Sequence, residues 1–73
     1  MVIDNLIKNL PWYKKIEILR RANNWTQEEA AEKCSTNQKM YWSWEKRKNY
    51  PRKSSQLSIA RAYKVKVEDI FPV

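Results

Sequence analysis

The side chains best suited to specific recognition are amides and amines near the middle of the chain. Gln38 and Lys39 stand at the start of a segment with helical apolar spacing, and Ser43 follows about one turn later. A glutamine amide can form two hydrogen bonds with adenine, and a lysine amine can donate to O6 and N7 of guanine. These residue types at this spacing indicate recognition of base edges, provided that a helix presents them outward.

Composition excludes most catalytic chemistry. The 73-residue chain has one cysteine, Cys34, and contains neither histidine nor glycine. Zinc fingers and Ser-His-Asp triads are therefore excluded, as are the glycine-rich loops that bind nucleotide phosphates. Glu28, Glu29 and Glu32 fit a solvated helix surface better than a catalytic carboxylate pair. We expect no enzyme, no metal and no cofactor, and we expect Cys34 to be a small core residue.

The formal net charge of +7 is unevenly distributed along the chain. Residues 34–66 hold nine Lys or Arg against one acid, and the densest run is residues 46–53, which includes Lys46, Lys48 and Arg52. Such a run is usually a solvated face. Because this one follows a helix rich in polar and aromatic residues, a polyanionic partner is favoured. No apolar run could cross a bilayer and no signal-peptide pattern is present, so we expect no membrane association and a cytoplasmic location.

The apolar spacing is helical throughout and indicates one domain. Residues 1–11 are expected to be an N-terminal extension or a short helical turn, and residues 12–73 the folded domain. Within that domain the expected helices cover residues 12–23, 27–34 and 38–46, a segment capped by Ser54 or Ser55 with Leu57, Ile59, Ala60 and Tyr63 as its apolar set, and a short turn over 67–71. Thr26 with Glu29 forms a capping box, and Asn37 caps the next helix.

Two short helices joined by a tight turn suit the major groove of DNA, which admits one helix. The helix over 27–34 would cross the backbone while the helix over 38–46 lies in the groove. Ala30 and Ala31 are small enough for close packing between the two. Trp42 has two interpretations. It could contact a thymine methyl or a sugar, or it could be buried against Lys46 or the following helix, and the second interpretation is favoured.

The order of these features resembles the lambda-repressor and Cro-like (XRE-type) helix-turn-helix domains. The resemblance rests on Leu19-Arg20, residues 25–33 (WTQEEAAEK), residues 43–48 (SWEKRK) with Pro51, residues 59–63 (IARAY) and residues 67–71 (VEDIF). It extends over about residues 16–71 without a gap. It implies an all-α, compact five-helix fold in which the second and third helices form the helix-turn-helix.

The resemblance also implies roles for individual side chains. Gln27 would contact a DNA phosphate, as an anion at a helix N-terminus would require. Arg20 and Glu45 would form a salt bridge that ties the first helix to the third. Base contacts are expected from Asn37, Gln38, Lys39, Trp42 and Ser43, and phosphate contacts from Lys46, Lys48 and Arg52 as well as Gln27.

Two positions depart from the family pattern. Ser35, in the turn between the two helices, and Arg47, just after the third helix, stand where the family usually has glycine. Both must adopt a left-handed conformation, at a cost of about 1–2 kcal/mol each, or the turns must adjust.

The expected function is sequence-specific binding of double-stranded DNA by a transcriptional repressor of phage, prophage or mobile-element type. It would act as a homodimer, formed mainly on DNA, at a dyad-symmetric operator in the nucleoid of a bacterial or phage-infected cell. Ile70, Phe71 and Val73 could supply the dimer surface together with Tyr50, or Ile70 and Phe71 could close the core.

The alternative is a protein-interaction module of the same fold, antitoxin- or antirepressor-like, that binds a protein partner. An exposed apolar patch formed by Trp42 and Tyr50 would favour this alternative.

Overall fold

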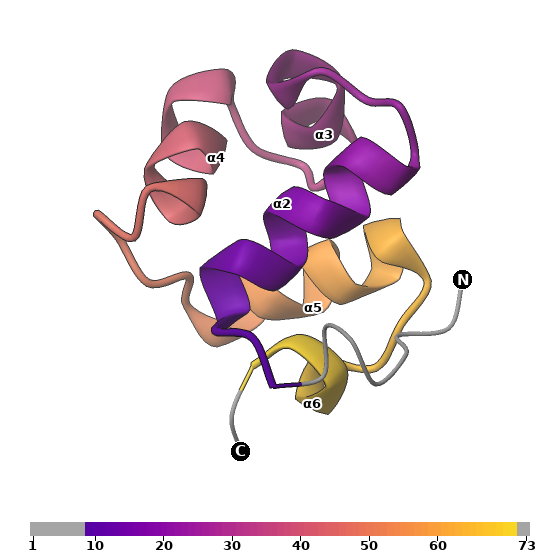
Figure 1. The fold of residues 1–73 in the computed structure, drawn as a ribbon. Coiled ribbons are helices and arrows are strands. Elements are labelled where there is room, and N and C mark those ends of the chain that lie inside the picture. Colours follow the sequence, from indigo (N-terminus) through magenta and orange to yellow (C-terminus); the bar gives the residue numbers. More distant parts are fainter. Residues whose placement is uncertain (1–8, 72–73) are drawn as a thin grey trace.

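The computed structural model describes residues 9–71, and the described part of the chain contains five α-helices and no strand (Figure 1). The helices are α2 (Trp12–Ala22), α3 (Gln27–Lys33), α4 (Gln38–Glu45), α5 (Lys53–Tyr63) and α6 (Val67–Ile70). Figure 1 shows α3 and α4 at one end of the molecule and α6 at the other, with α2 and α5 between them. The predicted all-α, five-helix fold is confirmed. The predicted extension or turn over residues 1–11 lies largely on residues 1–8, outside the described residues.

Local hydrogen bonds define where the helix-turn-helix elements begin. The amide of Glu29 donates to Thr26 Oγ1 over 3.1 Å, and the amide of Thr26 donates to Glu29 Oε1 over 2.8 Å, which completes a capping box. Asn37 Oδ1 accepts from the amide of Met40 over 2.7 Å at the start of α4. Each cap satisfies amides that the first turn leaves without an intrahelical partner. The caps predicted for these two helices are confirmed.

The start and inner face of α5 differ from the prediction. The helix begins at Lys53, and neither Ser54 nor Ser55 caps it. Pro51 disfavours helix at the residue before it. Arg52 is the N-cap of α5, and Gln56 Nε2 in its first turn donates to the carbonyl of Pro51 over 3.0 Å. Leu57 is 54% exposed, because the core face is defined by other residues of the same helix.

The core contains small residues on α3 and large aromatic ones around them. Its buried members are Ile16, Leu19, Ala30, Ala31, Cys34, Tyr41, Trp44, Ile59, Tyr63, Ile70 and Phe71. The hydroxyls of Tyr41 and Tyr63 lie 2.6 Å apart, and Tyr41 Oη donates to the carbonyl of Ile16 over 3.4 Å, so the buried phenols are hydrogen-bonded. Burial raises the pKa of both phenols, and it raises the pKa of Cys34 to about 12. Cys34 is a core residue, as expected.

Helices α2 to α5 all end in the same way, without glycine. The residues with positive φ are Asn24, Ser35, Arg47 and Lys64, with angles of 58–60°. In each case the next residue's amide donates to the carbonyl five positions earlier, as from Thr36 to Ala31 over 2.9 Å. This pair of features defines the Schellman motif, in which a left-handed residue closes the helix. Of the two alternatives for Ser35 and Arg47, the left-handed conformation is the one present at both positions.

Candidate nucleic-acid interface

Helices α3 and α4 pack closely and leave one side of α4 open to solvent. Ala30 and Ala31 are buried, so the two helices can approach closely. Tyr41 and Trp44 turn inward from α4 and anchor it in the core. The residues on the outer side of α4 are exposed and include Gln38, Lys39, Met40 and Trp42.

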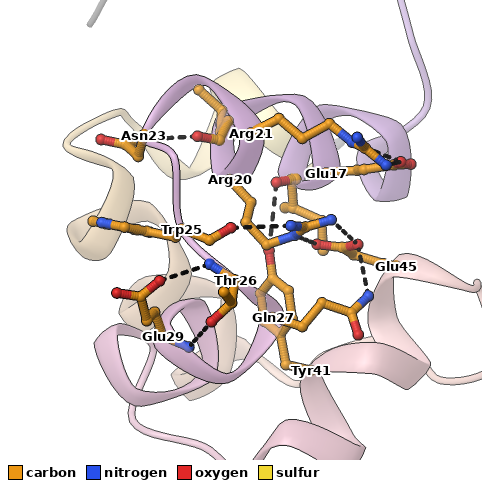
Figure 2. Close-up of polar contacts among 12 residues, drawn as sticks. Glu17, Arg20, Arg21, Asn23, Trp25, Thr26, Gln27, Glu29, Tyr41 and Glu45 are labelled. Atoms are coloured by element: carbon orange, nitrogen blue, oxygen red, sulfur yellow. Dashed lines mark hydrogen bonds and ion pairs between the residues drawn. The ribbon is translucent and has the colours of Figure 1, made fainter.

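A buried ion pair fixes the orientation of α4. Arg20 Nε lies 2.7 Å from Glu45 Oε2, and Arg20 Nη2 donates to Glu45 Oε1 over 3.3 Å (Figure 2). Arg20 Nη1 also donates to the carbonyl of Trp25 over 3.0 Å. The hydrogen bond that Arg20 donates to Glu45 raises the pKa of the guanidinium further above its usual value, so the guanidinium stays charged. The salt bridge that the resemblance implies is therefore present, and it joins α2, the turn before α3 and the end of α4.

The same carboxylate holds Gln27, a contact that the sequence did not indicate. Gln27 Nε2 donates to Glu45 Oε1 over 3.2 Å, and Figure 2 shows Gln27 reaching toward the carboxylate from the start of α3. This contact positions the half-buried side chain at the N-terminus of α3. That terminus carries the partial positive charge and the amides that attract anions. The geometry suits a group that must be held still beside a phosphate.

The basic loop, residues 46–50, is fixed at several points. The amide of Lys48 donates to the carbonyl of Ser43 over 2.8 Å. The guanidinium of Arg47 lies 5.7 Å from the centre of the Tyr13 ring, within the range of a cation–π contact. The backbone that carries Lys46 and Lys48 is thereby held against α4 and α2, while both lysines remain exposed. Arg52, just beyond the loop, is exposed as well.

Ser43, which was expected to contact bases, is largely buried. It is only 7% exposed, and its hydroxyl donates to the carbonyl of Met40 over 2.6 Å. The same hydroxyl accepts from Asn49 Nδ2 over 3.1 Å. A helical serine often bonds back to the preceding turn in this way. The structure therefore gives Ser43 the role of tying the basic loop to α4, together with Asn49, which the sequence did not single out.

The favoured interpretation of Trp42 as a buried residue is wrong, because Trp42 is 38% exposed. Trp42 and Tyr50 line different hollows, and Met40 and Asn49 line both of them. Tyr50 packs edge-on against Trp12 and Phe71, with ring centres 5.2 Å and 6.0 Å away. Trp42 therefore stays available on the outer side of α4.

Within residues 9–71 no cluster of three or more histidine, cysteine or acidic residues could hold a metal ion. None of the helices in the same range has the length and apolar character needed to cross a membrane.

The capped α3–α4 pair, its fixed orientation and the exposed polar helix beside a basic loop define a DNA-binding domain of the helix-turn-helix class. Residues 16–70 match the family model described as Helix-turn-helix. The chain belongs to this family, of the XRE type that includes lambda repressor and Cro-like proteins, and the family consists of sequence-specific DNA-binding regulators. Searches among curated proteins and solved structures found no match to the chain.

Proposed function

We propose that the protein represses transcription by covering a promoter, in a phage, a prophage or a mobile genetic element within a bacterial cell. The observation that carries this proposal is the network of Arg20, Gln27 and Glu45. It fixes α4, which would read the bases, and Gln27, which would face a phosphate, in one unit. A rigid unit that binds DNA can exclude other proteins from the same site without chemistry of its own.

The proposed contacts divide into those that read bases and those that hold the backbone. Base edges would meet the first turn of α4 and its outer side, through Asn37, Gln38, Lys39 and Trp42. Phosphates would meet the start of α3 and the basic loop, through Gln27, Lys46, Lys48 and Arg52. Phosphate contacts set the register of a protein on the duplex, and base contacts supply the sequence preference. Ser43 would support both sets by joining α4 to the loop.

We propose that two copies bind together, because one small helix-turn-helix grips only a half-site. Ile70 and Phe71 are each 1% exposed and close the core, and Val73 lies outside the described residues. The surface proposed for the contact is instead the hollow that Tyr50, Leu57 and Val67 line beside Pro51. Tyr50 and Leu57 are both 54% exposed. Two copies that each carry a charge of +7 repel in solution, so DNA should promote their pairing.

Selection of bound sequences from random duplexes, with a nonspecific competitor present, tests the proposal. We expect enrichment of one dyad-symmetric site whose half-sites lie about 34 Å apart. A site without symmetry, bound by one copy, would contradict the dimer. Failure to enrich any sequence would contradict sequence-specific repression and favour the interaction-module alternative.

A further inference from the structure

An open hollow of about 440 Å³ lies on the outer side of α4, between that helix and the basic loop. Met40 and Trp42 line it with exposed apolar side chains, 40% and 38% accessible. Lys39 and Lys48 line the same hollow. Exposed apolar residues that stand singly on a protein surface are normal, whereas a group of them indicates an interaction site. Met40 and Trp42 form such a group on a surface that is otherwise polar and basic.

The hollow is held in shape by hydrogen bonds. Ser43, the small residue that follows Trp42 in sequence, also lines it, and its hydroxyl lies 3.6 Å from the sulfur of Met40. Asn49 donates to the same hydroxyl from the loop over 3.1 Å. The part of the hollow formed by Ser43 and Asn49 is therefore fixed before any ligand binds.

The surroundings decide which apolar group the hollow accepts. An apolar protein surface placed here would bury the amines of Lys39 and Lys48 without compensation, at a high cost. A DNA duplex would instead supply phosphates and base acceptors to the two lysines. In unmodified DNA the apolar group displayed in the major groove is the C5-methyl of thymine.

We infer that the hollow between Met40 and Trp42 receives the C5-methyl group of a thymine, which makes these two residues determinants of sequence specificity. This inference rests on the proposed DNA binding and adds a particular base to it. The volume leaves room for the edge of the base as well as for its methyl group.

The test uses the duplex enriched by the selection, in which each thymine is replaced in turn by deoxyuridine. The replacement keeps base pairing and removes only the methyl group. We expect one position in each half-site at which uridine weakens binding by about fourfold, which corresponds to about 0.8 kcal/mol for one buried carbon group. The uridine series in the unaltered protein does not depend on the folding of any variant.

Variants then assign the methyl group to its partners. Met40→Ala and Trp42→Ala should each bring the thymine-to-uridine ratio at that position close to one. Ile18→Ala is the matched control, because Ile18 is a half-buried apolar residue of α2 that does not line the hollow beside α4. It should leave the ratio unchanged. Thermal melts of all three variants should show folded proteins.

Several outcomes would overturn the inference. Equal binding of all uridine duplexes would contradict it while leaving the proposed function intact, whereas a failed selection would remove both. An unchanged ratio in Met40→Ala and Trp42→Ala would place the methyl group elsewhere. Tighter binding when 5-methylcytosine paired with guanine replaces the thymine pair would identify methylated cytosine, rather than thymine, as the preferred source of the group.

Discussion

Glu45 lies where α2, α3 and α4 meet, and its side chain is only 4% exposed. It accepts hydrogen bonds from both Arg20 and Gln27. Withdrawing a carboxylate from water is costly, and an excellent hydrogen-bonding geometry offsets that cost. The carboxylate therefore depends on its partners, and removing one of them should cost much more than the loss of an exposed ion pair.

Arg20→Ala should lower the free energy of unfolding by about 3–5 kcal/mol, because it leaves the Glu45 carboxylate buried without its cation. Urea denaturation at neutral pH measures this loss. Arg21→Ala is the matched control on the same helix. Arg21 pairs with Glu17 over 3.2 Å at the surface, so its removal should cost about 0.3–0.5 kcal/mol. Similar losses in the two variants would contradict the role given to the buried pair.

Gln38→Ala should relax the preference for one base pair in each half-site, with a loss of about 1–3 kcal/mol of discrimination. Gln38 is exposed at the start of α4, so the variant should melt at the parent temperature. Competition binding with duplexes that vary at single positions provides the measurement.

Gln27→Ala supplies the contrast for Gln38→Ala. It removes a proposed phosphate contact together with the hydrogen bond to Glu45, so it should weaken binding to all sequences alike. An unchanged base preference in Gln38→Ala would mean that α4 enters the groove in another register. Unfolding of Gln38→Ala would make that residue structural.

At the scale of the elements, helices α2 to α5 all end in a left-handed residue other than glycine, and each of these residues carries conformational strain. Each of the four C-terminal turns places a residue other than glycine near φ 60°. A side chain with a Cβ atom pays about 1–2 kcal/mol in that region, and asparagine tolerates it better than serine, arginine or lysine do. The turns form nevertheless, because the Schellman hydrogen bonds and the core on either side require them.

Lys64→Gly should therefore stabilise the protein by about 1 kcal/mol, after the greater freedom of glycine in the unfolded chain is subtracted from the relieved strain. The melting temperature should rise by about 4–8 °C for a domain of this size. Arg61→Gly, in the last turn of α5, should have the opposite effect and cost up to about 1 kcal/mol. A decrease in stability for both variants would show that Lys64 makes contacts more valuable than the strain it carries.

The sequence predicted those elements whose signals are local. Thr26, Glu29 and Asn37 cap their helices within three residues, so the boundaries of α3 and α4 could be read from the chain. The start of α5 was predicted wrongly, because a serine suggested a side-chain cap, whereas the observed N-cap is Arg52 and no side chain caps this helix. The contacts of Gln27 with Glu45 and of Ser43 with Asn49 depend on how separate segments meet in space. No local pattern encodes that geometry.

At the scale of the whole molecule, the proposed DNA-binding side is also the basic side. Residues 39–53 hold six of the fifteen lysines and arginines in the chain. Lys39, Lys46, Lys48 and Arg52 are all exposed on α4 or shortly after it. Lysines that contact phosphates release counterions from the duplex, so the affinity should fall steeply as salt increases.

Lys48→Ala should reduce the slope of log affinity against log salt concentration by about one unit, because one phosphate contact is lost. The preference among duplex sequences should remain, since phosphates carry no direct base information. The backbone amide of Lys48, which bonds to the Ser43 carbonyl over 2.8 Å, is unaffected by the change, so the loop should keep its shape.

Lys66→Ala is the control for Lys48→Ala, because it removes the same charge from another side of the molecule. Lys66 is exposed at the start of α6, and Figure 1 places α6 at the opposite end from α3 and α4. Both variants lose one positive charge, so they alter the long-range field of the protein by the same amount. If the slope depended on net charge alone, the two variants would change it equally. A smaller slope for Lys48→Ala together with an unchanged slope for Lys66→Ala would place the phosphate backbone against the basic loop, and equal slopes would move the interface elsewhere.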